Sequence, residues 1–380
     1  MAVDEAVELG EEIMDLSQVG KTIDGSGHAY YQLDCVGKNV GQIQILESYA
    51  HLRQIDLSRN RIQDVGPLSK LGHILRLNLA RNAIESIDSW QPEALTHLLY
   101  LDLSGNLLTA LPALHMPALK SANFAANKIA TCKAFRGHAK LQALDLSDNQ
   151  LPDLEGVCSM PRLETLKVGG NALSSVAGVR DIPALQTLDV SKNQLPELAG
   201  PWQLLATLTS LDVSGNMIVT AAGLGPLQRL PDLRTFATGE QFPAPAVPPP
   251  AEEGEPPAEP EQPEPVKLER LESLILQPKI AVLDGEEVTE EEREEAKALN
   301  EKRIEEEAER RRQEEEARAA EMAERLAKEE EERLAREEEE RIAAEEAAAK
   351  AAEEAAAREA EEAAAAAAMA EGDEGEEEEE

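Results

Sequence analysis

The sequence is 380 residues long and carries a formal net charge of −38 at pH 7, a length that accommodates two or three domains. Residues 1–238 hold 25 acidic against 19 basic groups, whereas residues 239–380 hold 50 against 18. A field this negative repels phosphate backbones and anionic lipid, so nucleic acid and membrane surfaces are poor partners and basic proteins are favoured. No apolar run is long enough to span a membrane, and we therefore expect a cytoplasmic protein.

Residues 1–29 are predicted to form a polar leader that caps the N-terminal end of the domain behind it. The chain has three cysteines, Cys35, Cys132 and Cys158, which are odd in number and widely spaced. This pattern favours reduced thiols packed as small apolar side chains over disulfides or a zinc site.

Residues 30–242 are built from one repeated unit. The motif HLRQIDLSRNRI at residues 51–62 returns seven more times, for example as HLLYLDLSGNLL at 97–108, and successive copies are 21 to 24 residues apart. Degenerate copies at the two ends place Lys38 and Gln241 in the slot where the others have asparagine. The asparagines in that slot are Asn60, Asn82, Asn106, Asn127, Asn149, Asn171, Asn193 and Asn216.

The pattern L-x-x-L-x-L-x-x-N-x-L resembles the leucine-rich repeat. Its central x-L-x-L alternates with a period of two, which predicts a short strand in each copy with the leucines pointing inward. The resemblance implies an α/β fold, a leucine-rich-repeat solenoid with a parallel concave sheet. The C-terminal sequence, taken below, predicts that a long charged single α-helix follows it. Each asparagine follows a strand where the chain bends, and its amide can bond backbone groups of adjacent turns. We interpret the asparagine column as structural.

The outward-facing residues of the strands form the predicted partner-binding surface, because repeat proteins use their concave faces for binding. Tyr100 is the single aromatic residue in these columns, so affinity would come from area and charge. Stacked Asp and Asn would repel unless a basic partner relieved the charge; the alternative is that these positions are only solvated. The candidate residues are Asp56, Arg76, Asn78, Tyr100, Asp102, Asn123, Asp145, Lys167, Asp189 and Asp212.

No sequence motif indicates catalysis, a cofactor or a metal. His51, His73 and His97 share one slot in three consecutive copies, which makes a metal site or a pH switch conceivable. Because no carboxylate or thiolate accompanies them, we interpret them as a surface ladder. We expect no enzymatic activity, no cofactor and no bound metal.

The C-terminal part begins with residues 243–265, where ten of 23 residues are proline, a density that predicts an extended, disordered insert. Helical spacing resumes in VKLERLESLIL, so residues 266–288 are predicted to cap the last repeat. Thr289 to Glu292 then form a capping box, and residues 290–370 lack proline and glycine. We predict one long Glu/Arg/Ala-rich helix over 289–370 and an acidic tail over 371–380.

Beyond the repeats, the chain resembles the leucine-rich-repeat subunits of ciliary radial spokes. The resemblance is carried by GSGHAYYQLD at 25–34, by ESYAHLRQIDLSRNRIQDVGPLSKLGHILRLNLARNAI at 47–84, by FAANKI at 124–129 and by LESLILQPKIAVLDGEEVTEEEREEA at 271–296. The insert and the length of the charged helix depart from that family. The resemblance implies a non-catalytic scaffold in the cilium or flagellum axoneme, part of the cytoskeleton, whose partners are other radial-spoke proteins with basic or helical segments.

Three functions stay open on the sequence. The first is this radial-spoke subunit, a monomer within a larger complex. The second is a cytosolic regulatory adaptor of the phosphatase-binding type, in which the concave face does the binding. The third is an acidic-tailed chaperone of basic proteins, in which the C-terminal charge does the binding.

Overall fold

The computed structural model describes residues 7–10, 16–21, 27–90, 94–200, 202–243 and 264–370. The chain forms two compact units that divide after Asn300. The strands are β1 (Val7–Glu8), β2 (Ser17–Lys21), β3 (His28–Asp34), β4 (Val40–Gln42), β5 (Gln54–Asp56), β6 (Arg76–Asn78), β7 (Tyr100–Asp102), β8 (Ser121–Asn123), β9 (Ala143–Asp145), β10 (Thr165–Lys167), β11 (Thr187–Asp189), β12 (Ser210–Asp212), β13 (Thr235–Ala237), β14 (Glu240–Gln241), β15 (Val266–Lys267), β16 (Val282–Leu283) and β17 (Glu286–Glu287). The α-helices are α1 (Arg270–Leu276) and α2 (Glu290–Ala370).

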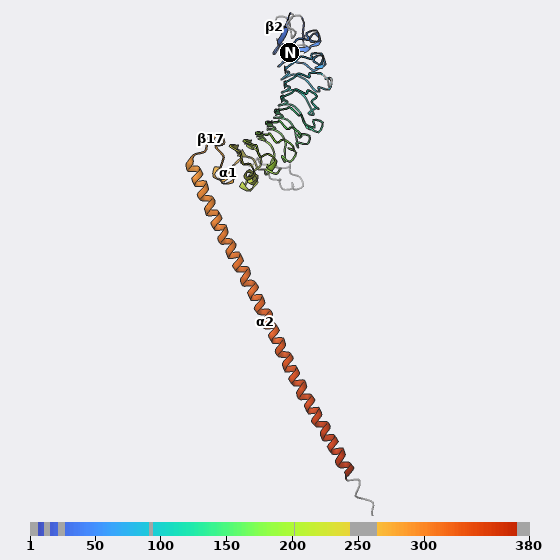
Figure 1. Cartoon of the computed structure of the whole chain (residues 1–380), viewed down its shortest axis with the longest axis vertical. Coiled ribbons are helices and arrows are strands. Elements are labelled where there is room, and N and C mark those ends of the chain that lie inside the picture. The colour runs from blue at the N-terminus through green and yellow to red at the C-terminus, as the bar shows by residue number, and fades with distance from the viewer. Residues whose placement is uncertain are drawn as a thin grey trace, which may run out of the picture. The chain divides into compact units, whose positions relative to one another are not determined.

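The first unit is a solenoid whose repeats stack into a curved array (Figure 1). Its main sheet has 13 strands in the order β17-β16-β13-β12-β11-β10-β9-β8-β7-β6-β5-β3-β2. From β3 to β16, each strand pairs in parallel with the next strand of the sheet. The pairing aligns equivalent positions of successive repeats, for example Leu144 in β9 with Leu166 in β10. The period-two pattern therefore places the central apolar residue of each repeat strand, most often leucine, in the core and the residues on either side of it on the concave face.

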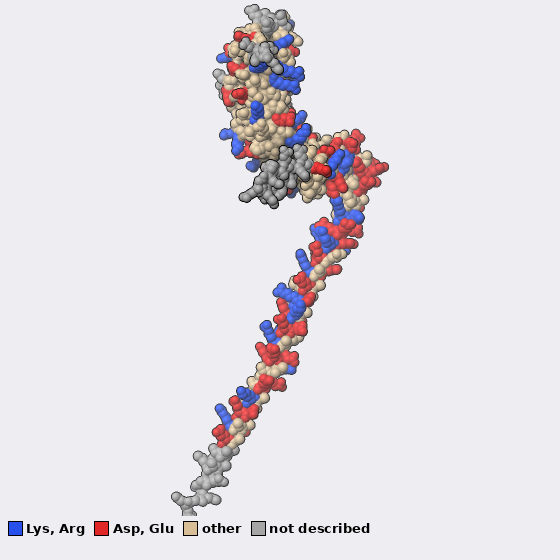
Figure 2. All heavy atoms as spheres, turned by 180° about the vertical axis from the view of Figure 1, so that it is seen from behind, with Lys and Arg blue, Asp and Glu red and all other residues tan. Residues whose placement is uncertain are grey.

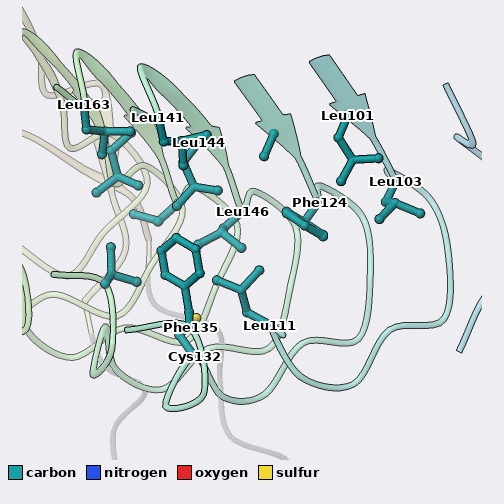
Figure 3. Close-up of a cluster of buried hydrophobic side chains, with 14 of the residues drawn as sticks. Leu101, Leu103, Leu111, Phe124, Cys132, Phe135, Leu141, Leu144, Leu146 and Leu163 are labelled. Atoms are coloured by element: carbon teal, nitrogen blue, oxygen red, sulfur yellow. The ribbon is translucent and has the colours of Figure 1, made fainter. Parts of the chain in front are cut away.

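The core of the solenoid is a continuous column of leucines that meets apolar residues from the convex side. Strand and post-strand residues such as Leu101, Leu144 and Leu146 point inward, and Phe135 and Cys132 face them from the convex loops (Figure 3). The convex connections include 3₁₀ helices at Gln44–Ser48, Gly66–Lys70, Trp202–Leu204 and Ala221–Arg229. No single repeat can bury its own leucines, so stability depends on the stack.

The N-terminal leader contributes strands to the end of the solenoid. β2 pairs antiparallel with β3, and β1 pairs in parallel with β4. Leu9 is buried, and the hydroxyl of Tyr31 donates to the side chain of Gln18 at 2.9 Å. The described part of the leader therefore covers the first repeat.

The C-terminal cap closes the other end. β16 extends the parallel sheet beside β13, and β17 turns back antiparallel to β16. Leu274, Ile280 and Leu283 are buried against the last repeat. The Asp284 carboxylate accepts the backbone N–H groups of Thr238 at 2.7 Å and Gly239 at 2.9 Å. The N–H of Val213, which corresponds to Thr238 in the preceding repeat, bonds the next repeat, so Asp284 replaces a further repeat at this position. The predicted proline-rich insert at 243–265 falls, apart from its ends, outside the described residues.

Helix α2 starts at the capping box expected from the sequence. The Thr289 N–H donates to the Glu292 carboxylate at 3.0 Å, and the Glu292 N–H donates to the Thr289 hydroxyl at 3.2 Å. Arg293 donates to the carbonyl of Ile280 at 2.7 Å, and Ala296 is buried. The first turns of the helix thus belong to the first unit, and so the units divide after Asn300 and not at Thr289.

The second unit is the rest of α2, a single helix with side chains exposed throughout its described length to residue 362. Acidic and basic side chains alternate along it (Figure 2). Arg310 lies 3.7 Å from Glu314, four residues after it, and Arg341 lies 3.9 Å from Glu338, three residues before it. An exposed arginine can reach carboxylates on either side of it, so the spacing predicts that pairs form but not which ones. The predicted tail at 371–380 lies outside the described residues.

Candidate binding surface on the concave sheet

The concave surface is held in place by the asparagine column. Asn149 is representative: its amide N–H groups donate to the carbonyls of Leu146 at 3.0 Å and of Phe124, one repeat earlier, at 3.0 Å. Its side-chain oxygen accepts the N–H of Ile129 at 3.0 Å. The same three-way contact recurs along the column, and Gln241 makes it at the last repeat, accepting the N–H of Ile218 at 3.2 Å. Each amide therefore joins two repeats and fixes the spacing of the strands.

The residue before each asparagine has a left-handed backbone, which the sequence reasoning missed. Glycine occupies this slot in three repeats, and the other five carry side chains there. The residues with φ between +51° and +69° in this slot are Arg59, Arg81, Gly105, Ala126, Asp148, Gly170, Lys192 and Gly215. The recurring glycines were the available signal, because only glycine adopts this conformation without strain.

The aspartates of the concave column stabilise the turn that follows each strand. In Asp56 one carboxylate oxygen accepts both the N–H of Ser58 at 2.9 Å and its hydroxyl at 2.6 Å. The same Asp-x-Ser turn recurs at Asp102, Asp189 and Asp212, and at Asp145 through the serine N–H. Each aspartate therefore has one oxygen committed to the turn after its strand and keeps the other for contacts across the face.

The asparagines of the concave column reduce the repulsion between its aspartates. The amide of Asn78 donates to the second oxygen of Asp56 at 2.9 Å, and Asn123 donates to Asp102 at 3.3 Å. Neutral amides therefore separate Asp56, Asp102 and Asp145 and lower the repulsion between them without a partner, whereas Asp34 aligns directly with Asp56. A partner on this face therefore needs an anchor in addition to opposite charge.

Such an anchor lies in a hollow of the concave face over β3 to β8. An open depression of about 480 Å³ lies there, and it brings together six of the ten predicted residues: Asp56, Arg76, Asn78, Tyr100, Asp102 and Asn123. The Arg76 guanidinium lies 4.2 Å from the centre of the Tyr100 ring, and 39% of the tyrosine is exposed. This cation–π pair is the aromatic anchor of the surface, and it presents both an apolar face and a positive charge to a partner.

The other four predicted residues lie farther along the sheet and outside the hollow. Lys167 aligns with Asp145 on one side and Asp189 on the other, and Asp189 aligns with Asp212. The end of the hollow toward β3 is lined by Gln32, Asp34 and Gln54, which belong to the same two columns but were not among the predicted residues. The sequence contained the signal, because the degenerate first copy continues both columns.

Several titratable side chains elsewhere in the solenoid are buried or stacked against neighbours. Burial raises the pKa of the Cys132 thiol to about 12, and the charge of Asp153 adds to the rise. Burial lowers the pKa of His138, whose Nε2–H donates to the Met116 carbonyl at 3.0 Å. The rings of His73 and His97 stack with centres 6.2 Å apart. In the part of the chain that the structure describes, no group of three or more His, Cys, Asp or Glu side chains is arranged to hold a metal.

Comparisons with known proteins agree with this geometry. The leucine-rich repeat family matches residues 50–108, and a second leucine-rich repeat family matches residues 205–227. Together with the stacked strands and the asparagine column, these matches define a leucine-rich repeat protein. None of the helices among the described residues combines the length and the apolar character that crossing a membrane requires.

Among curated proteins, the chain is similar to leucine-rich repeat-containing protein 23 of Homo sapiens and of Bos taurus. Each is 31% identical over 151 residues, which are 39% of this chain and 37% of the relative's length. Among solved structures, an internalin (inlF) from Listeria monocytogenes covers 67% of this chain and 86% of its own at 18% identity, with a TM-score of 0.32. The functional domain of InlJ from Listeria monocytogenes covers 68% of this chain and 64% of its own at 17% identity, with a TM-score of 0.37.

Proposed function

We propose that this leucine-rich repeat protein is a non-catalytic structural subunit of the ciliary or flagellar axoneme, located in a radial spoke. Its solenoid holds one neighbouring protein on the concave hollow, and α2 contacts others along its length. The partners are other axonemal proteins with basic or helical segments, and the chain itself is a monomer within the complex.

The observation that carries this proposal is the pair of segments that resemble radial-spoke subunits but that the repeat pattern does not require. GSGHAYYQLD supplies β3, and ESYAHLRQIDLS supplies the next convex turn and β5. The two segments contact each other, because the rings of Tyr30 and Tyr49 lie 5.9 Å apart, and β3 pairs with β5. A resemblance shared by two segments that pack together is more specific than one carried by leucines alone.

The concave hollow supports the scaffold function physically. Repeat surfaces bind protein partners through area and a few anchors, and the Arg76–Tyr100 pair is such an anchor. The carboxylates of Asp34, Asp56 and Asp102 around it favour a partner that brings lysine or arginine. We expect one partner segment with an aromatic or apolar residue against Tyr100 and basic residues beside it.

Helix α2 suits a spacer better than a dimerising coiled coil. Coiled coils need large apolar residues about every 3.5 positions, whereas Leu326, Leu334 and Ile342 are eight apart. These three side chains are between 48% and 60% exposed and wind around the helix without forming a straight seam. The i,i+4 ion pairs sustain the helix locally, so it spans distance without a second strand.

The experiment is fractionation of ciliated cells that express the protein. We expect the full chain to stay with demembranated axonemes through moderate salt and to be released together with radial-spoke proteins. Recovery in the soluble fraction would contradict the axonemal location.

A cytosolic adaptor is the second candidate, and the hollow favours it, because one concave anchor is enough for an adaptor. In that case Tyr100→Ala and Arg76→Ala would abolish binding of a soluble partner while α2 could be removed without effect. The acidic-tailed chaperone predicts a different result, since salt that screens the C-terminal charge would release basic proteins from the chain.

A further inference from the structure

A second surface lies away from the concave face, on the loops that lead into β10, β11 and β12. Three repeats form an open hollow of about 460 Å³ there. Its walls are Ser159, Pro161, Asp181, Ile182, Pro183 and Leu204. Leu204 is 57% exposed, and among the described residues of the solenoid it is the one leucine so exposed. Burying a leucine side chain is favourable, so this exposure is a feature that a partner would use.

The floor of the hollow is preorganised. The N–H of Ser159 donates to the carbonyl of Arg180 at 3.3 Å, and the N–H of Met160 donates to the carbonyl of Asp181 at 3.1 Å. The Thr207 hydroxyl donates to the carbonyl of Pro183 at 2.9 Å. Because these bonds tie three consecutive loops together, a ligand there would not have to order them on binding.

Cations flank the hollow. Lys140 and Arg162 occupy the slot just before the first leucine in two successive repeats, and Arg180 precedes Asp181 in the wall. All three side chains are exposed, and none has an ion-pair partner among the described residues. In the loop segments 137–142, 159–164 and 180–184 that carry these cations, the acids are Asp181 and Glu164, so the segments keep a positive excess in a chain whose net charge is −38.

We propose that this surface, formed by the Leu204 hollow with Lys140, Arg162 and Arg180, docks an acidic amphipathic helix of a partner protein. One large apolar side chain of the helix enters the hollow, and carboxylates one turn away on the same face meet the cations. Helix neighbours at i and i+4 lie about 5 to 6 Å apart, which matches the spacing of about 5 Å between corresponding residues of adjacent repeats. A phosphate-bearing polymer would use the cations but not the apolar hollow, and the net charge of the chain repels it.

The test is fluorescence anisotropy with the full chain and a labelled Ala/Glu helical peptide that carries one central leucine. We expect Arg162→Glu with Arg180→Glu to weaken binding by about tenfold or more at low salt. Leu204→Ser should weaken it by about fivefold, and so should replacing the leucine of the peptide with alanine. Lys70→Glu with Lys128→Glu, which makes the same charge change at two exposed sites outside the hollow, is the matched control and should leave binding unchanged. All of these sites are exposed, so unchanged circular dichroism will show that the variants fold.

Three results would overturn the proposal. The first is equal affinity for the leucine and alanine peptides, which would leave the hollow without a role. The second is binding of anionic phospholipid vesicles that Leu204→Ser does not weaken, which would make the surface a general anion site. The third is self-association of the full chain that Arg162→Glu with Arg180→Glu abolishes, which would assign the surface to the acidic helix of a second copy.

Discussion

Leu144 in the solenoid is 1% exposed, whereas Leu334 in α2 is 54% exposed. Both are leucines in regular secondary structure, but the strand that holds Leu144 has three residues and exists only because strands of neighbouring repeats pair with it. The helix that holds Leu334 makes its own hydrogen bonds within one segment. The first region is therefore stabilised by contacts between residues about 22 positions apart, and the second by contacts three or four positions apart.

This difference determines how each region can serve as a scaffold. A solenoid whose repeats depend on each other holds its surface side chains at fixed spacing, which suits binding at a defined hollow. A helix with mostly charged, exposed side chains has no fixed partner surface and sets a length instead. Substitutions should therefore be severe in the solenoid and mild in the helix, and the following predictions test that contrast from the largest effect to the smallest.

The largest effect is expected where two solenoid loops touch. Gly137 has φ +88°, and a Cβ there would lie 2.0 Å from the carbonyl oxygen of Cys158. We expect Gly137→Ala to lower the free energy of unfolding by about 4 kcal/mol, from backbone strain and overpacking together. Gly72→Ala is the control, because no atom lies within 4 Å of its added Cβ. Equal denaturation midpoints for the two variants would mean that these loops are not in contact.

The direct comparison of the two regions uses one substitution in each. Leu144→Ala leaves a cavity in the core and should lower the free energy of unfolding by about 3 kcal/mol. Leu334→Ala removes an exposed side chain from a helix and should change it by less than about 0.5 kcal/mol. Urea denaturation followed by circular dichroism measures both. A large effect of Leu334→Ala would show that α2 is buried against another chain.

The asparagine column predicts an intermediate effect. Asn149→Ala leaves the Ile129 N–H without its acceptor and removes one of the two amide donors to each of the carbonyls of Phe124 and Leu146, so we expect a loss of about 2 kcal/mol. Asn78→Ala removes the bond to Asp56 and the bond that its oxygen accepts from the Ala80 N–H, both half-buried and open to replacement by water, and should lose about 1 kcal/mol. Thermal denaturation of both variants checks the order. The reverse order would make the concave alternation, and not the asparagine column, the joint between repeats.

The smallest effect concerns the junction of the two regions. Hydrogen bonds from Thr289 and the Arg270 guanidinium lower the pKa of Glu292. A lowered folded-state pKa stabilises the fold above the ordinary pKa of the carboxyl group, and this contribution disappears as the pH falls through the lowered value. Acidification should therefore loosen the start of α2 by less than about 1 kcal/mol in this partly exposed site. The protection of the amides of residues 290–296, measured by hydrogen exchange relative to the intrinsic exchange rate at each pH, should fall at low pH in the native chain but be nearly independent of pH in Glu292→Gln.

Local patterns in the sequence were enough to predict much of this architecture. The repeated asparagine and leucine slots predicted the parallel sheet, and Thr289 with Glu292 predicted the start of α2. The Asp-x-Ser turns and the left-handed slot of Arg59 were missed because they are backbone conformations, which repeated side chains indicate only indirectly. The Leu204 hollow could not be predicted, since its walls come from three repeats and depend on the path of their loops.

Electron tomography of axonemes from cells that lack the protein decides whether it is a radial-spoke scaffold, as we propose. We predict that a class of radial spokes is missing or truncated while the microtubule doublets stay complete, and that the full chain restores the spokes. Axonemes with every spoke present and unaltered in the absence of the protein would contradict the account.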